Sequence, residues 1–131
     1  MAYRTTNRDR SHNKIVAELK DMHYGVIDLA MVGKGVADLL VANRLVTALV
    51  EIKEPDGHIY ISQLLTLATW KGQSIIAQTS DEVHHAMLHQ KFLTDVDKAK
   101  MLDIVARYAA KSKADRPKIS VAKFDKEMYE S

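Results

Sequence analysis

The chain has 131 residues, of which 47% are hydrophobic and 27% charged, so its length and composition predict one globular domain, residues 1–131, with a buried core. It has no cysteine, which excludes disulfide bonds and thiolate metal sites. The N-terminal segment is polar and no apolar run approaches the length of a membrane span, so we expect a soluble cytoplasmic protein with no signal peptide and no membrane partner.

The net charge is only +2, but basic residues gather at both ends of the chain. Residues 1–20 contain five basic and two acidic side chains, and residues 111–131 contain six basic and four acidic ones. Basic ends suit a polyanionic partner such as nucleic acid, although an ordinary solvated surface has the same composition.

The first elements are a helix and a strand. Apolar residues at spacings of three and four predict a helix over Asn13–Met22, with Ser11 as its N-cap. Looser alternation predicts a strand over Val26–Val32. The glycines of the segment 33–35 predict a turn or a close approach of the backbone.

A hairpin and a crossover unit follow. The segments Val36–Ala42 and Val46–Lys53 are rich in valine, leucine and isoleucine, and they read as two paired strands. A helix over Ser62–Trp70, closed by Gly72, then leads to a short buried strand over Ser74–Gln78. Strand, helix and strand in this order predict a parallel pair with a right-handed crossover.

The C-terminal third is predicted to be helical. Two capping-box signatures start helices, one that runs to Phe92 and one that runs to about Lys111; they are Thr79 with Glu82 and Thr94 with Asp97. The second helix is either a dimer face or a cover for the core. Residues 113–131 read as an extension or a partner-binding arm, in which Phe124 and Met128 predict a short amphipathic helix.

The hairpin carries three charges that need an explanation. A two-residue loop centred on Arg44 and Leu45 makes Asp38 the direct partner of Glu51. Opposite residues share a face of the sheet, with Cβ atoms about 4.5–5.5 Å apart. Lys53 follows Glu51 by two residues and so lies on the same face.

Two carboxylates so close together repel each other unless one is protonated or a cation lies between them. Mg²⁺ suits such a pair, because it takes oxygen ligands and is commonly held by one or two carboxylates plus phosphate. Lys53 could then position or deprotonate a water molecule, or stabilise charge on a phosphate. The alternative is a structural ion pair in which Lys53 only neutralises Glu51.

Three segments together resemble a known family. "GKGVADLLVA", "ALVEIK" and "SQLLTLATWKG" are similar to the PD-(D/E)XK nuclease superfamily, and most of all to small phage and bacterial nucleases of the VRR-Nuc type, which are related to Holliday-junction resolvases. The resemblance covers residues 9–83, and residues 84–131 form a C-terminal helical extension outside it. It implies α/β architecture with a restriction-endonuclease-like core, in the order α-β-β-β-α-β, whose small mixed sheet is flanked by helices, with extra C-terminal helices.

The resemblance also implies roles for individual residues. Asp38, Glu51 and the backbone carbonyl of Ile52 are the expected metal ligands, Lys53 is the expected catalytic lysine, and Gln63 is expected to shape the site. The family proline before the aspartate is Ala37 here, and His12 occupies the position of the usual acid in the first helix. His12 and Glu18 are therefore both candidates for an auxiliary role.

The expected function is that of a Mg²⁺-dependent DNA endonuclease, with Mn²⁺ as a substitute, acting on branched or double-stranded DNA in a bacterial or phage-infected cell. Lys34, Arg44 and Lys71 are the expected DNA contacts. Symmetric cutting of a junction needs two sites, so we expect a homodimer. The alternative is an inactive nuclease fold that serves as a DNA-binding or assembly module.

Two other features have a functional and a structural interpretation. His85 and His89 are four residues apart on a predicted helix, which is compatible with a metal pair but lacks a third ligand, so a solvated helix face is the simpler interpretation. Trp70 ends a predicted helix, where packing against the sheet is favoured over stacking on a base.

Overall fold

A computed structural model describes residues 7–33, 35–111 and 116–130, with side chains from residue 10 onward. These residues confirm the expected α/β class. In chain order the elements are α1 (Asn7–Asp21), β1 (Gly25–Asp28), β2 (Leu39–Ala42), β3 (Thr47–Ile52), β4 (His58–Tyr60), α2 (Ile61–Thr69), β5 (Gln73–Ala77), α3 (Ser80–His89), α4 (Asp95–Lys111), β6 (Lys118–Ser120) and α5 (Val121–Tyr129).

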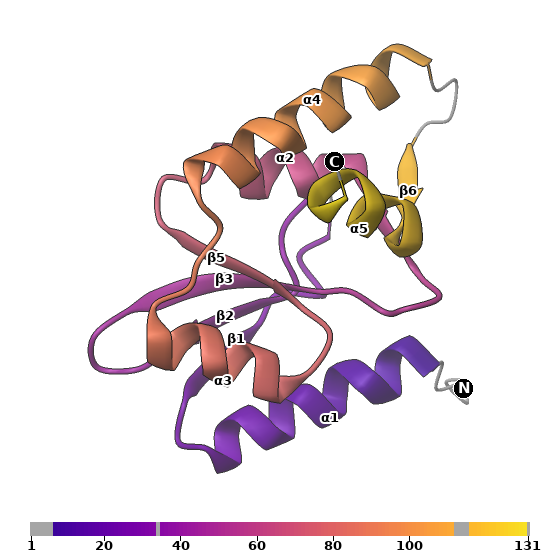
Figure 1. Cartoon of the computed structure of the whole chain (residues 1–131). Coiled ribbons are helices and arrows are strands. Elements are labelled where there is room, and N and C mark those ends of the chain that lie inside the picture. The colour runs from indigo at the N-terminus through magenta and orange to yellow at the C-terminus, as the bar shows by residue number, and fades with distance from the viewer. Residues whose placement is uncertain (1–6, 34, 112–115, 131) are drawn as a thin grey trace.

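The main sheet is small and mixed, with strand order β1-β2-β3-β5. Its first three strands are antiparallel, and β5 runs parallel to β3 after the crossover through α2, as predicted. Helices α1 and α3 lie on one face of the sheet, and α2, α4 and α5 lie on the other (Figure 1). Within the described ranges, no helix is both long and apolar enough to span a membrane.

The register of the hairpin is the predicted one. Leu39 pairs with Val50 and Ala42 pairs with Thr47, which places Arg44 and Leu45 at the centre of the loop. The loop is closed by Asn43, whose side-chain Oδ1 accepts the backbone N–H groups of Leu45 and Val46 at 2.8 and 2.9 Å. This asparagine turn explains how a tight hairpin forms here without an Asn-Gly pair.

Of the two predicted capping boxes, one is complete and one is formed in part. Thr94 and Asp97 bond each other reciprocally at the start of α4. At the start of α3 the Thr79 hydroxyl accepts the N–H of Glu82 at 3.1 Å, but the Glu82 carboxylate accepts the N–H of Gln78 instead of that of Thr79. The end of α3 was predicted three residues too late. The helix stops at His89 because Gln90 takes a left-handed conformation with φ 53°.

The N-terminal elements differ from prediction at their boundaries. Helix α1 begins at Asn7, so Ser11 lies inside the helix and the predicted cap is wrong. Strand β1 ends at Asp28 instead of continuing to Val32. There the Asp28 side chain accepts the N–H of Ala30 at 2.9 Å, and this local bond turns the chain out of the sheet.

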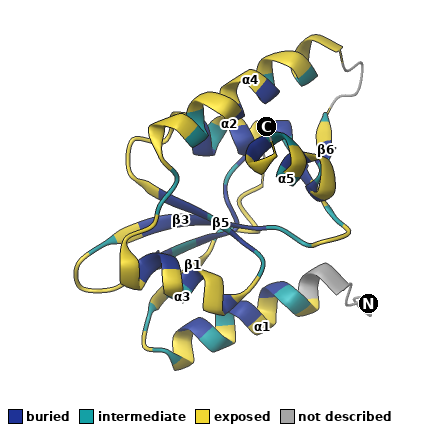
Figure 2. Cartoon of the chain, in the orientation of Figure 1, coloured by how far each residue is buried: buried dark blue, intermediate teal, exposed yellow. Residues whose placement is uncertain are grey.

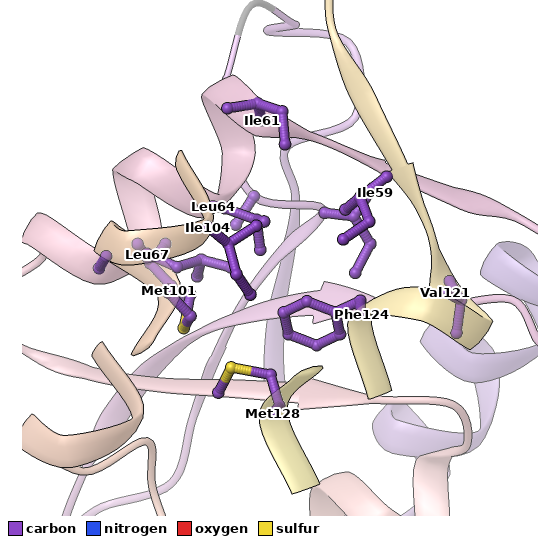
Figure 3. Close-up of a cluster of buried hydrophobic side chains, with 13 residues drawn as sticks. Ile59, Ile61, Leu64, Leu67, Met101, Ile104, Val121, Phe124 and Met128 are labelled. Carbon is purple, nitrogen blue, oxygen red and sulfur yellow. The ribbon is translucent and has the colours of Figure 1, made fainter. Parts of the chain in front are cut away.

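The C-terminal segment, in its described part, is folded against the core and does not extend as an arm. Strand β6 pairs with β4 in a second, two-stranded sheet that the sequence did not predict. The predicted amphipathic helix is α5, and its Phe124 and Met128 turn into a cluster with Ile59, Leu64 and Met101 (Figure 3). The buried sides of α2, α4 and α5 face one another in Figure 2.

Helix α4 covers α2 through Met101 and Ile104, both almost fully buried. Of the two interpretations of this helix, the structure therefore shows a cover for the core. The predicted end of α2 is also corrected. Its C-cap is Trp70 in an extended conformation, and Gly72 lies against the indole, where an added Cβ would be 2.7 Å from the ring nitrogen.

Candidate active site at the edge of the sheet

One edge of the main sheet collects the three charged residues of the hairpin. The pairs Leu39–Val50 and Ile52–Ala77 show that β2 begins where β3 and β5 end. Asp38 immediately precedes β2, and Glu51 lies at the end of β3. Continued by one residue, the hairpin register places these two acids opposite each other, on the face that carries Leu40 and Leu49 toward α2.

Asp38 closes the ladder between β2 and β3. Its side chain is buried, at 3% exposure, and its Oδ2 accepts the backbone N–H of Ile52 at 2.8 Å. Its own backbone carbonyl accepts the N–H of Leu29 at 2.8 Å. The carboxylate is therefore fixed at the mouth of the hairpin by the main chain of two neighbouring segments.

Glu51 is held by the helix that follows the hairpin. It is 2% exposed, and its Oε1 accepts a hydrogen bond from Gln63 Nε2 at 3.2 Å. The Gln63 Oε1 in turn accepts the backbone N–H of Tyr60 at 3.1 Å, at the start of α2. Gln63 thus connects the helix start to the carboxylate and fixes the orientation of both groups.

Lys53 lies next to the carboxylates in sequence but is paired with a residue of the C-terminal helix. Its Nζ donates to Asp125 Oδ1 at 2.7 Å, and it lies 5.4 Å from the centre of the Tyr129 ring. The lysine side chain is 11% exposed and that of Asp125 is 34% exposed. This partner could not be predicted, because 72 residues separate Lys53 from Asp125 and no local pattern relates them.

A cavity of about 190 Å³ opens beside Asp38. Gly35 forms part of its wall with a φ of 89°, and an added Cβ there would lie 3.2 Å from the carbonyl oxygen of Ser62. Glycine is thus required both by the left-handed conformation and by the close approach of α2. The lining also includes Gly33, Asp38, Tyr60, Gln63 and Arg116.

Arg116 is a cation at this cavity that sequence reasoning missed. Its guanidinium carbon lies 3.8 Å from the centre of the Tyr60 ring, which positions the charge by a cation–π contact. Arg116 lies just before β6 in the chain. The pairing of β6 with β4 places it at the cavity beside Asp38.

The two auxiliary candidates of the first helix lie on the opposite face of the sheet. His12 Nε2 is 2.9 Å from Asp28 Oδ2, and Asp28 shares a face with its partner Leu39, under α1. Burial acts to raise the pKa of Asp28, but the hydrogen bonds from Ala30 and His12 outweigh it and lower that pKa. Glu18 accepts a hydrogen bond from Ser80 of α3 at 3.2 Å.

The predicted DNA contacts are not gathered around the carboxylates. Arg44 lies in the hairpin loop and Lys71 lies just before β5, so both are at the other end of the sheet. Lys34 lies outside the described residues. The rings of His85 and His89 are 4.5 Å apart on an exposed side of α3. Trp70, at the end of α2, is 42% exposed.

The donor groups at this end of the sheet are oxygen atoms. Across the described parts of the chain, no three histidine, cysteine, aspartate or glutamate side chains are grouped so that they could hold an ion by themselves. Asp38 and Glu51 offer carboxylate oxygens, and a carboxylate can accept several bonds at once. Two carboxylates completed by a backbone oxygen, water and phosphate suit Mg²⁺.

Comparisons with known proteins do not assign the chain to a family. No protein-family model, no curated protein and no solved structure matches it.

Proposed function

We propose that the protein is a Mg²⁺-dependent DNA endonuclease that hydrolyses phosphodiester bonds at the sheet edge. The observation that carries the proposal is the opposed, buried pair Asp38 and Glu51 with Lys53 two residues further on. The order of elements supports it. Apart from the short β4, which belongs to the second sheet, a helix, three antiparallel strands, a crossover helix and a parallel strand follow in the order of the restriction-endonuclease-like core that the sequence resembles.

The chemistry follows from the groups at the edge. Asp38, Glu51 and the backbone carbonyl of Ile52 would hold the ion. When bound, the ion would neutralise negative charge on the phosphate and lower the pKa of a water molecule bound to it. Mn²⁺ would act as a substitute for Mg²⁺. Gln63 keeps Glu51 in place through its hydrogen bond. The Lys53 ammonium donates hydrogen bonds to a phosphate oxygen as negative charge builds up there.

The substrate we propose is branched DNA. Its backbone enters beside the cavity at Asp38, where Arg116 supplies a positive charge and the glycines at 33 and 35 leave room for close approach. Cutting both strands of a junction symmetrically takes two sites, so we propose that the working form is a homodimer. The cytoplasm, where such DNA occurs, is the proposed location.

Asp38→Asn tests the proposal. Asparagine keeps an acceptor for the Ile52 N–H while it removes the charge that binds a metal. Linear, flap and four-way-junction DNA would be incubated with the protein in Mg²⁺, in Mn²⁺ and in EDTA. We expect cleavage by the wild type in both metals and none by the variant, with unchanged DNA affinity.

The matched control is Asp21→Asn, which removes an exposed carboxylate at the end of α1. It should cleave like the wild type. Cleavage by the Asp38 variant at the wild-type rate, or cleavage in EDTA, contradicts the assignment. A protein that stays monomeric on junction DNA in a sizing measurement contradicts the dimer.

A second candidate function is that of an inactive DNA-binding or assembly module. One observation favours it: His12, at the position of the usual helix acid, is paired with Asp28 on the opposite face of the sheet. The same substrate panel separates the two functions, because a module of this kind binds DNA in gel-shift assays but leaves every substrate intact in either metal.

A further inference from the structure

The C-terminal helix contributes a charged group to the proposed active site. We propose that Asp125 is a positioning residue, which holds the ammonium of Lys53 in the place in which it assists phosphodiester hydrolysis. This inference rests on the proposed function and deepens it. The resemblance to nucleases ends at residue 83, so it assigns no role to Asp125.

The contact is direct and well enclosed. The Lys53 Nζ to Asp125 Oδ1 distance is 2.7 Å, within the range of a charge-assisted hydrogen bond, and the lysine side chain is 11% exposed. A lysine has four rotatable bonds, and an anchor at its end removes most of that freedom. The position of Lys53 beside Glu51 is therefore set by α5 as well as by β3.

The geometry of α5 is suited to this role. Phe124 and Met128 fix the helix in the core, and both are at most 2% exposed. Asp125 and Tyr129 are four residues apart, so they lie on one side of the helix, and both contact Lys53. A rigid helix thus presents an acid and an aromatic ring to one ammonium group.

The ion pair leaves room for a contact between Lys53 and a phosphate. An ammonium has three donor hydrogens, and one of them is used by Asp125. The other donors can reach a phosphate oxygen. We therefore assign Lys53 the stabilisation of charge on phosphate.

Asp125→Asn tests this role, with Glu127→Gln as a matched control on the same helix. Glu127 holds α5 to α4 through Arg107 at 2.9 Å and has no described contact with Lys53. Single-turnover cleavage rates and DNA dissociation constants would be measured for both variants. We expect the Asp125 variant to cleave about 10- to 100-fold more slowly with unchanged affinity for DNA, as for partners that orient metal-site groups.

A second readout does not depend on cleavage. The rate at which an acylating reagent modifies Lys53, mapped by mass spectrometry against exposed Lys126, should rise in the Asp125 variant and stay unchanged in the control. Equal cleavage by the two variants, or faster cleavage by Asp125→Asn, overturns the positioning role; the faster rate indicates an inhibitory latch. If the wild type cleaves nothing, the proposed function itself fails, which is a separate result.

A different observation supports a second inference, independent of the ion pair. We infer that a basic cavity of about 340 Å³ between α4, β6 and α5 binds a phosphate of the DNA backbone. Its wall includes Lys111, Lys118, Lys123 and Arg107. Tyr108 also lines the cavity, and the Lys123 Nζ lies 5.3 Å from the centre of its ring. The cavity therefore gathers four cationic side chains around one hollow.

The cavity is placed to continue the path of the DNA. Lys118 lines both this cavity and a neighbouring one that reaches Ile52 and Tyr60, and Tyr60 also lines the cavity at Asp38. Three adjoining hollows therefore lead from the proposed cutting site to the basic cavity. Arg107 is already paired with Asp103 and Glu127, so the lysines are the expected phosphate contacts.

The test compares Lys111→Gln/Lys123→Gln with Lys20→Gln/Lys91→Gln, which makes the same charge change at exposed positions of α1 and after α3. Junction DNA binding would be measured without metal across a range of salt. We expect a weaker affinity and a salt slope reduced by about one per lost contact for the first variant only. Equal slopes for the two variants overturn the inference, whereas a wild type that binds no DNA overturns the proposed function.

Discussion

The two faces of the sheet differ in how far their charged groups are buried. On the face of α1 and α3, the His12–Asp28 pair joins the first helix to the first strand, and the Asp28 side chain is 45% exposed. On the face of α2, α4 and α5, the carboxylate site, defined as Asp38, Glu51, Lys53 and Gln63, is largely buried and receives Asp125 from the end of the chain.

This difference points to the carboxylate site as the functional one. Burying two acids costs free energy, which the hydrogen bonds from the Ile52 N–H to Asp38 and from Gln63 to Glu51 partly offset. The pair of His12 and Asp28, whose acid is partly exposed, contributes little to stability. Substitutions on each face in turn test whether the two faces differ in function.

The largest effect is expected for Glu51→Gln on the carboxylate site. The change keeps the side chain's size and an acceptor for Gln63 but removes a charge proposed to bind metal. We expect cleavage to fall by about 10²–10³-fold or more. The melting temperature should be unchanged or higher, because a buried charge has been removed. A variant that unfolds instead would show that the charge stabilises the fold.

A smaller loss is expected for Gln63→Leu. This change removes the hydrogen bond to Glu51 and leaves the Tyr60 N–H without its side-chain acceptor. Cleavage should fall by about 10- to 100-fold, and the free energy of unfolding by about 1 kcal/mol. Thr66→Val on the same helix is the control, since it alters only a local bond to Ser62. Equal cleavage by the two variants would contradict a role for Gln63.

The face with the carboxylate site could be predicted in part from the sequence. The hairpin register followed from the symmetry of the loop, and the alternation of side chains along a strand placed Asp38 and Glu51 together. The capping boxes and the parallel pair were predicted for the same reason, because each depends on residues close in the chain or on one crossover.

The rest of that face could not be predicted. Strands β4 and β6 have three residues each, too few for a periodic pattern, and the segments they pair lie far apart in the chain. Arg116 and Asp125 reach the site only through that pairing and the packing of α5. Such long-range contacts have no local signature in a single sequence.

For the His12–Asp28 pair, the expected effect of a substitution is on the stability of the fold at low pH. Because the folded-state pKa of Asp28 is lowered, this group stabilises the fold at pH values above its unfolded pKa, about 3.9. That contribution is lost as the pH falls through the folded pKa. Urea unfolding from pH 6 to pH 2.5 should show a small advantage of the wild type over Asp28→Asn that begins to shrink below about pH 4. An advantage that stays constant between pH 4 and pH 2.5 would contradict this account.

The same face offers a test of the auxiliary role expected for the first helix. Since His12 is bonded to Asp28 under α1, His12→Gln should leave cleavage within about threefold of the wild type, well short of the loss expected for a residue that orients a metal ligand. A loss of 100-fold would show that α1 reaches the reacting phosphate across the sheet edge, and the two faces would then form one site.

The smallest effect is expected at the far end of the sheet. Arg44 and Lys71 lie at the opposite edge from Asp38, so Arg44→Gln/Lys71→Gln should change the dissociation constant for DNA by less than about twofold. Arg116→Gln removes only one charge, but at the cavity beside Asp38, and should weaken DNA binding more. The reverse ranking would mean that DNA runs along the hairpin loop. In that case the main DNA-binding surface would lie at the hairpin loop, at the end of the sheet far from Asp38.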